Sequence, residues 1–224
     1  MDKASAVDGM SDPRRRDRAY HAIRNGILAG TYGPNQRLTE MDLSTELGVS
    51  RQTVGIALVR LEQEGLVVAQ PNRGASVRSV SVAEALRALR VREALEGVAA
   101  SLAAEVVTTN ELAAMDAVLA QMGSRRDSAA LVEYSELNSK LHTLIVRAAR
   151  DETVDRMLES LNYAVVRYQS RTVLVPGRLQ HSLAEHAQIV EAVRAHDPAA
   201  AEYAARRHVA RIRDVLAHSA QLLS

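Results

Sequence analysis

Three histidines fall on or beside the apolar stripes of three predicted helices, and together they suggest a metal site. His142, His186 and His208 could all point into one bundle interior, and Asn138 lies one turn before the first of them. A buried imidazole needs a polar partner. Three imidazoles and one oxygen form a suitable ligand set for zinc, nickel or another divalent ion, with positions left open for a ligand. Taken singly, each histidine also fits a hydrogen-bonded core residue.

A second group of side chains could read DNA. Ser50, Arg51, Gln52 and Thr53 open a short helix just after a tight turn at Gly48, and such a helix can place its first turn in a major groove. Arginine can bind guanine or a phosphate, glutamine can pair with adenine, and threonine can contact a phosphate or a thymine methyl. The helix N-terminus itself favours phosphate. The same spacing also fits an ordinary helical hairpin, so both interpretations stay open.

The elements around this helix predict a winged helix over residues 17–80. A first helix is expected over about 17–29, and Thr39 is a good N-cap for a second helix that ends at Gly48. Ser50 then caps the third helix. Burial of one apolar face of this pair of helices would leave the first turn of the third helix exposed.

A two-stranded wing is predicted after the third helix. Residues 66–70 and 75–80 have the pattern of short strands, and a Pro-Asn-Arg-Gly turn joins them. At its tip, Asn72 and Arg73 could enter a minor groove. Gly74 would allow a close approach to the DNA backbone.

From residue 81 onward the sequence predicts helices almost everywhere. Ser81 and Glu84 have the spacing of a capping box, which marks the start of a second domain over residues 81–224. We expect an all-α antiparallel bundle of six helices there. They cover about 82–107, 111–122, 129–149, 152–172, 178–195 and 198–222.

The composition of the chain favours a helical protein in a reducing compartment. Its 224 residues include no Phe, Trp or Cys, so the core consists of residues that favour helices, and disulfides and thiolate metal sites are excluded. No apolar run is long enough to span a bilayer, and the start lacks the apolar centre of a signal peptide. We therefore expect a cytoplasmic protein without a membrane partner. Residues 1–16 are expected to form a disordered basic tail that either approaches phosphates or is simply solvated.

A recognisable family pattern runs through the first domain. Its residues are Arg37-Leu38-Thr39-Glu40, Leu43, Leu47-Gly48-Val49-Ser50-Arg51, Val54, Ala57-Leu58, Arg60-Leu61, Glu64-Gly65-Leu66-Val67 and Asn72-Arg73-Gly74. They resemble the winged helix of the GntR family of bacterial transcription factors. The resemblance implies dimeric binding to a short palindromic operator, with Arg37, the helix tip and the wing as DNA contacts. Gly55 and Met41 stand where the family usually has arginine, and Gln52 where threonine is frequent, which implies a different operator or weaker binding.

The second domain carries a less specific pattern. Its residues are Val91-Arg92-Glu93-Ala94-Leu95-Glu96, Leu102-Ala103-Ala104, Asn138 with Leu141-His142, Glu185-His186 with Ile189, and His208. They resemble the FCD ligand-binding domain of the FadR branch of the family, in its shorter VanR-like form. The resemblance implies that Asn138, His142, His186 and His208 hold a divalent metal, and that this domain dimerises. The family more often has Asp where this chain has Asn138, so the site is expected to be more cationic and weaker for metal.

An excess of positive charge would attract a small organic acid to the open metal positions. Arg92 is a candidate pocket residue for such a carboxylate effector. An equal alternative is that Arg92 only pairs with Glu96 on the helix surface, four residues on.

The expected function is a ligand-responsive transcriptional regulator, a repressor in most of the family. Two alternatives remain, namely a metal-dependent hydrolase and an architectural DNA-binding protein whose histidines are only structural. Against the hydrolase, no acid or nucleophile is evidently placed to act. Glu185 adjoins His186 in sequence, but successive helical residues point about 100° apart, so we expect Glu185 to point elsewhere.

Overall fold

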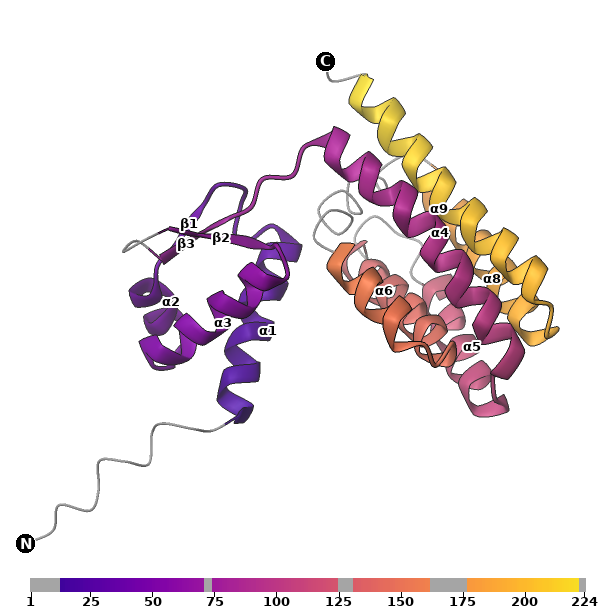
Figure 1. The fold of residues 1–224 in the computed structure, drawn as a ribbon, viewed down its shortest axis with the longest axis horizontal. Helices are drawn as coiled ribbons and strands as arrows, with labels where there is room; N and C mark the ends of the chain where they lie inside the picture. Colours follow the sequence, from indigo (N-terminus) through magenta and orange to yellow (C-terminus); the bar gives the residue numbers. More distant parts are fainter. Residues whose placement is uncertain (1–12, 71–73, 125–130, 162–176, 222–224) are drawn as a thin grey trace, which may run out of the picture. The chain divides into compact units, whose positions relative to one another are not determined.

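A computed structural model of the chain describes residues 13–70, 74–124, 131–161 and 177–221. The chain divides into two compact units, Met1–Ser79 and Val80–Ser224, and each is considered by itself below. The predicted mainly α fold, with a winged helix followed by a helical domain, is confirmed (Figure 1). Within the described ranges, no helix combines the length and the apolar character needed to cross a membrane.

The first unit is a winged helix with a small antiparallel sheet. Its core contains the fully buried side chains of Ile23, Leu43, Val54 and Leu61. The sheet has the strand order β1-β3-β2, so the predicted two-stranded wing gains a short third strand at its edge. The elements are α1 (Pro13–Ala29), β1 (Arg37–Leu38), α2 (Glu40–Leu47), α3 (Arg51–Gln63), β2 (Val67–Gln70) and β3 (Gly74–Val77).

Helix α1 begins earlier than the sequence predicts. It starts at Pro13 rather than near residue 17, and proline suits the first position of a helix because its missing N–H has no partner to lose there. Arg14, Arg15 and Arg16 therefore belong to a helix and not to the disordered tail expected over residues 1–16. Residues 1–12 lie outside the described part of the chain.

Two side-chain caps fix the helix-turn-helix. Thr39 accepts a hydrogen bond from the backbone N–H of Asp42 at 3.1 Å, and Ser50 accepts one from the N–H of Thr53 at 3.1 Å. Each cap satisfies a backbone donor that the first turn of a helix leaves unpaired. Between the two helices, Gly48 adopts the left-handed conformation with φ 64°, which glycine tolerates at little cost.

Gly74 is required by the fold as well as being a candidate DNA contact. It has φ +84°, and a Cβ at this position would lie 2.4 Å from the carbonyl oxygen of Leu38. The next residue, Ala75, is the pairing partner of Leu38 in the sheet. A side chain at residue 74 would therefore push β1 away from β3.

The second unit is a helical bundle whose helices match the predicted ones closely. Ser81 caps the first of them by accepting from the N–H of Glu84 at 3.2 Å, as the capping box predicts. Residues 152–161 are also helical, and the rest of the helix predicted over 152–172 lies outside the described residues. The other helices are α4 (Val82–Val106), α5 (Thr109–Ser124), α6 (Leu131–Ala148), α8 (Arg178–Arg194) and α9 (Pro198–Gln221).

Helices α4 and α9 run antiparallel and pack along each other (Figure 1). Small residues permit this close approach. A Cβ at Gly97 of α4 would lie 2.6 Å from the Cγ of Arg206 on α9, and Ala85, Ala100 and Ala103 of α4 are buried. The packing matters for the site, because α4 and α9 each contribute side chains to it.

Candidate metal centre and DNA-contacting surface

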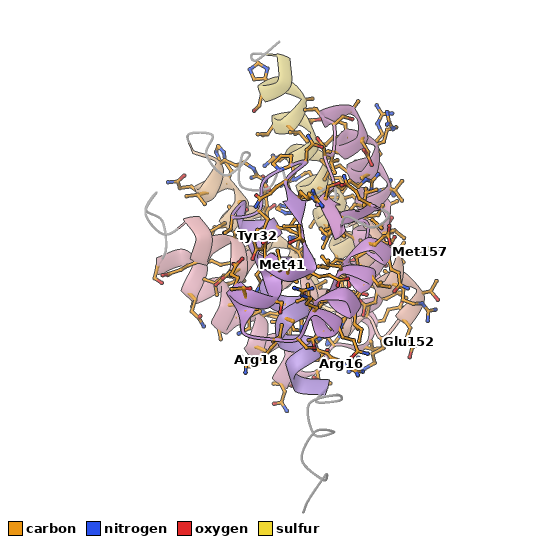
Figure 2. The ribbon with its side chains drawn as sticks, turned by 90° about the vertical axis from the view of Figure 1, so that its left-hand side faces the viewer. Arg16, Arg18, Tyr32, Met41, Glu152 and Met157 are labelled. Atoms are coloured by element: carbon orange, nitrogen blue, oxygen red, sulfur yellow. The ribbon has the colours of Figure 1, made fainter. Side chains whose placement is uncertain are left out.

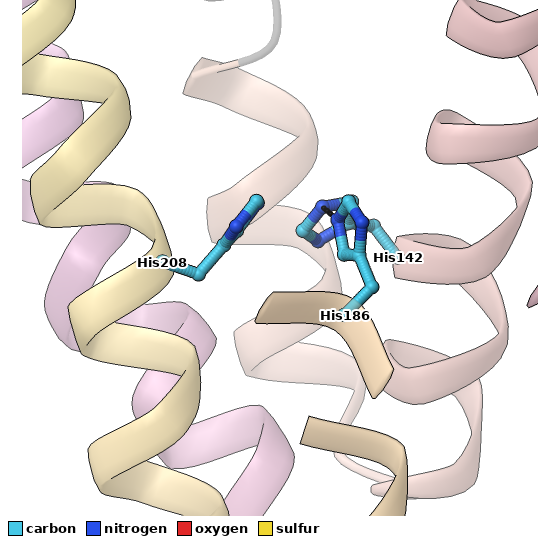
Figure 3. Close-up of side chains that lie close together, drawn as sticks. All are labelled: His142, His186 and His208. Carbon is cyan, nitrogen blue, oxygen red and sulfur yellow. Dashed lines mark hydrogen bonds between the residues drawn. The ribbon is translucent and has the colours of Figure 1, made fainter. Parts of the chain in front are cut away.

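The three histidines singled out in the sequence come together inside the second unit. His142 belongs to α6, His186 to α8 and His208 to α9, and one nitrogen of each lies within 4.8 Å of the others (Figure 3). His186 and His208 are completely buried, and His142 is partly buried. Three different helices thus supply one cluster of imidazoles.

Two carboxylates fix the orientation of two of these rings. The Nδ1 of His142 donates to Oε2 of Glu96 at 2.9 Å, and the Nδ1 of His208 donates to Oε2 of Glu185 at 2.7 Å. An ionised carboxylate can only accept, so each ring carries a proton on Nδ1 and, in its neutral form, keeps a lone pair on Nε2. This is the arrangement in which protein histidines bind metals through Nε2.

The Nε2 atoms of the three rings lie close together, and hydrogen bonds among them cannot satisfy all three. The Nε2 atoms of His142 and His186 are 3.2 Å apart, while Nδ1 of His186 lies 3.5 Å from the hydroxyl of Ser182. The Nε2 of His208 is buried and has no hydrogen-bond partner among the described residues. One shared proton between His142 and His186 would leave that nitrogen unsatisfied, whereas a cation would satisfy all three. The donor set therefore fits a divalent metal such as zinc or nickel.

Burial also favours the neutral form of the two fully buried rings, those of His186 and His208. It lowers the pKa of His186 well below its ordinary value, with the neighbouring His208 and His142 acting in the same direction. Burial likewise lowers the pKa of His208, against the opposing effect of its hydrogen bond to Glu185. Metal ligation needs neutral imidazoles, so the protein environment favours the form that binds.

Glu96 is a site residue that sequence reasoning treated only as a surface partner of Arg92. Burial alone would raise the pKa of Glu96, but His142 and Arg92 hold it well below its usual range. Arg92 donates to Oε1 of Glu96 from the preceding turn of α4. The pairing at i,i+4 is the alternative foreseen for Arg92, although both side chains lie largely inside the bundle and not on the helix surface.

The expectation that Glu185 points away from the histidines is wrong. Besides His208, Glu185 accepts hydrogen bonds from Arg178 and Arg211, each at 3.0 Å. Burial would raise the pKa of Glu185, but these partners lower it to about 2. The 100° between Glu185 and His186 does not separate them, because the buried face of α8 is wide enough to include both.

Spacing could have identified both carboxylates. Glu96 follows Leu89 by seven residues and precedes Ala103 by seven, so it lies on the buried stripe of α4. Glu185 precedes Ile189 by four and lies likewise on the buried stripe of α8. A charged residue on such a stripe is almost never fully buried unless it is paired, and this is the signal for a functional partner.

The remaining predicted residues of the metal site are Asn138 and Arg92. Asn138 is buried one turn before His142 on α6, which is compatible with ligation by its amide oxygen. Beside His142 lies a small cavity that combines one carboxylate and one imidazole with apolar walls. It is lined by Glu96, Ala99, His142, Ile145, Val146, Ile189 and Ala205.

Four of the predicted DNA-contacting residues, Ser50 to Thr53, lie at the N-terminal end of α3. Arg51 and Gln52 are exposed in its first turn. Ser50 and Thr53 are partly committed to the cap, because their hydroxyls also lie 2.9 Å apart. Arg37 is exposed on β1.

Of the predicted wing-tip residues, only Gly74 belongs to the described part of the chain. Gly74 opens β3, whereas Asn72 and Arg73 lie outside the described residues.

The departures from the family pattern also have structural consequences. A Cβ on Gly55 would lie 3.0 Å from Oε1 of Glu40, so the carboxylate of Glu40 packs over the glycine. Met41 is 56% exposed on the outer side of α2 (Figure 2). The two positions at which arginine would add positive charge therefore present a carboxylate and a thioether.

Comparison with known proteins assigns both units to known families. The model of bacterial regulatory proteins of the gntR family matches residues 15–77, and the FCD domain model matches residues 87–211. The HTH-type transcriptional repressor RspR of Escherichia coli strain K12 is 28% identical over 195 residues, which cover 86% of this chain and 85% of RspR. A probable D-xylose utilization operon transcriptional repressor of Paenarthrobacter nicotinovorans is 31% identical over 190 residues, covering 80% and 79%.

Solved structures show the same fold. McbR/YncC of E. coli aligns with a TM-score of 0.79 at 19% identity, over 94% of this chain and 99% of that protein. A putative GntR regulator from Rhodococcus sp. RHA1 aligns with a TM-score of 0.70 at 20% identity, over 92% and 98%. The proteins matched by sequence are transcriptional regulators, which favours that class over a hydrolase.

Proposed function

The chain belongs to the GntR family of bacterial regulatory proteins, is a DNA-binding transcriptional regulator and carries an FCD domain, and we propose that a metal ion and a small carboxylate effector in this domain control its affinity for an operator. The regulated affinity is that of a homodimer for a palindromic site. In this proposal Arg37, residues 50–53 and the wing residues 72–74 contact the DNA. Two named relatives are repressors, and repression is the proposed sign of regulation here.

The observation that carries the proposal is the unsatisfied Nε2 of His208. It is buried among described residues that offer it no partner, and it faces two further imidazoles whose ligand atoms lie within 4.8 Å. His142, His186 and His208 would hold the metal, with the amide oxygen of Asn138 as a fourth ligand. When bound, the ion supplies a Lewis-acidic point to which an oxygen of an organic acid can attach.

The charges around the pocket explain why a carboxylate effector would depend on the metal. Glu96 and Glu185 are held ionised near the histidines, and Arg92, Arg178 and Arg211 pair with them. These ion pairs cancel most of the local charge, so the pocket by itself would attract an anion only weakly. A divalent cation among three neutral imidazoles would supply the attraction. Arg92 remains a candidate effector contact that would have to share its guanidinium with Glu96.

Helix α4 offers a route from the pocket to the DNA-binding unit. It carries Glu96, and its first residue, Val82, follows the end of the first unit by three positions. Ligand binding in the pocket would draw α4, α6, α8 and α9 into one preferred arrangement. In a dimer whose two α3 helices must match half-sites at a fixed helical spacing, a shift of α4 would change operator affinity by favouring one arrangement.

The test uses the purified full-length chain and a duplex selected from random sequence. Operator affinity is measured for chelator-stripped protein and for protein reloaded with Zn²⁺ or Ni²⁺, each against a panel of small organic acids. We expect at least one acid to change operator affinity in the loaded protein and to have no effect on the stripped protein. Equal responses of both forms would remove the metal from the scheme. His218 is exposed on α9 and lies outside the histidine cluster. A His218→Ala variant should therefore respond to metal and acids as the parent does.

A further inference from the structure

The outward face of α3 is apolar beyond its first turn. Gly55, Ile56 and Val59 follow Gln52 by three, four and seven residues and so share one face of the helix with it. Ile56 is 41% exposed and Val59 is 56% exposed. Single exposed apolar side chains are normal on a protein surface, but these two continue the face that Gln52 begins in the first turn of α3.

The same helix carries few cations that could bind phosphates. Every residue of α3 is described, and its basic residues are Arg51 and Arg60. Arg60 is engaged inside the unit, because its guanidinium lies 3.7 Å from the ring centroid of Tyr20 and 3.5 Å from carboxylate oxygens of Asp17 and Glu64. Beyond the first turn, α3 therefore has little positive charge to offer to the DNA backbone.

The neighbouring helix does not supply the missing charge at this point. The carboxylate of Glu40 packs over Gly55, where a Cβ would lie 3.0 Å from Oε1. Because this part of α3 presents apolar side chains and little positive charge to the DNA backbone, its face is better suited to base edges. The apolar group that a base edge presents in the major groove is the C5 methyl of thymine.

We infer that Ile56 reads the methyl group of a thymine in the operator half-site, one turn along α3 from Gln52. Val59, one turn further along the same face, borders this contact. The inference rests on DNA binding by the first unit and narrows the operator sequence, which the proposed function leaves open. It commits the exposed face of α3 to DNA and not to a protein partner.

The experiment removes one methyl group at a time from the DNA. The preferred duplex is selected from a random pool with the purified full-length chain, and each thymine is then replaced singly by deoxyuridine, which lacks only the C5 methyl. We expect one position in each half-site at which the loss weakens binding by roughly fourfold, the factor that corresponds to burying one methyl-sized group. In an Ile56→Ala variant, the thymine and deoxyuridine duplexes should bind equally.

Two controls separate this contact from other effects. Val106→Ala deletes an exposed apolar side chain of the second unit and should keep the full deoxyuridine sensitivity. Thermal unfolding of Ile56→Ala should match the parent, because the side chain is not part of the core.

Several results would overturn the inference. One is a selected operator that has no thymine in its half-site. Another is a loss of affinity on deoxyuridine substitution that is as large in Ile56→Ala as in the parent. The third is an Ile56→Ala variant that no longer self-associates but binds DNA as the parent does. Failure to select any duplex would instead defeat the proposed function, and this inference with it.

Discussion

Glu96 on α4 accepts the Nδ1 proton of His142 on α6 at 2.9 Å, and this hydrogen bond links the helix that leads to the DNA-binding unit with the helix that carries a candidate metal ligand. Glu185 does the same for His208 between α8 and α9. Two buried carboxylates thus stand behind candidate metal ligands, and each is also paired with arginine, Glu96 with Arg92 and Glu185 with Arg178 and Arg211.

Replacing Glu96 with glutamine should weaken metal binding by about 10- to 100-fold, the usual effect of losing a carboxylate behind a ligating histidine. The amide keeps the shape of the side chain but removes the negative charge that makes His142 a stronger metal ligand. Competition with a chromophoric chelator measures the affinity for Zn²⁺. Glu105→Gln, an exposed change on the same helix, should leave the affinity unchanged. An equal loss in both variants would show that Glu96 has no special role.

Zinc should raise the melting temperature of the protein, and His208→Ala should abolish the rise. A ligand that binds only the folded state stabilises it by about 2.7 kcal/mol at a hundred times its dissociation constant, which corresponds to roughly 5–10 °C for a chain of this size. Scanning calorimetry with and without Zn²⁺ checks this shift. His218→Ala changes an exposed histidine of the same helix and should retain it. A zinc-induced rise that survives in His208→Ala would place the metal elsewhere.

Local signals in the sequence were sufficient for most of the fold, whereas long-range partners were not. The caps at Thr39, Ser50 and Ser81 depend on residues only three positions away, and each forms as the spacing predicts. Strand β1 was not predicted, because a strand of two residues is too short to show an alternating pattern in the sequence. It exists only because β3 pairs with it.

The same difference between local signals and long-range partners applies to the candidate metal site. The histidines could be identified from their apolar stripes, since burial of an imidazole is visible in helical spacing. Their carboxylate partners were harder to predict. The position of Glu96 is already accounted for by its local partner Arg92, so the sequence gives no reason to look for His142. Glu185 meets His208 only because α8 packs on α9.

Replacing Gly55 with arginine should strengthen DNA binding and make it more sensitive to salt. One added phosphate contact steepens the logarithmic salt dependence by about 0.9, and loss of the mid-helix glycine stabilises α3 by up to about 1 kcal/mol. The carboxylate of Glu40, 3.0 Å from the new Cβ position, must move slightly to admit the longer side chain. Fluorescence anisotropy across a salt series measures the slope. Gly55→Ala isolates the helix effect and should leave the slope unaltered.

Alkaline pH should destabilise the winged helix through Tyr20. Its hydroxyl donates to both carboxylate oxygens of Glu64, at 2.7 and 2.8 Å. Burial and this hydrogen bond raise the pKa of Tyr20 from 10.0 to about 12. The folded state therefore holds the phenolic proton more tightly than the unfolded state, and the free energy of unfolding should fall as the pH rises from about 10 to about 12.

The matched variant is Tyr20→Phe, which keeps the buried ring and removes the titrating group. It should be less stable than the parent at neutral pH by roughly 1 kcal/mol, because the hydrogen bond is lost, and should lose less stability between pH 10 and 12. Tyr32, whose pKa burial and Glu46 also raise to about 12, should account for part of the remaining slope, which Tyr20→Phe combined with Tyr32→Phe would reduce further. Urea unfolding followed by circular dichroism at each pH measures these differences. Parallel curves for the parent and the double variant would mean that neither phenol contributes to the alkaline loss.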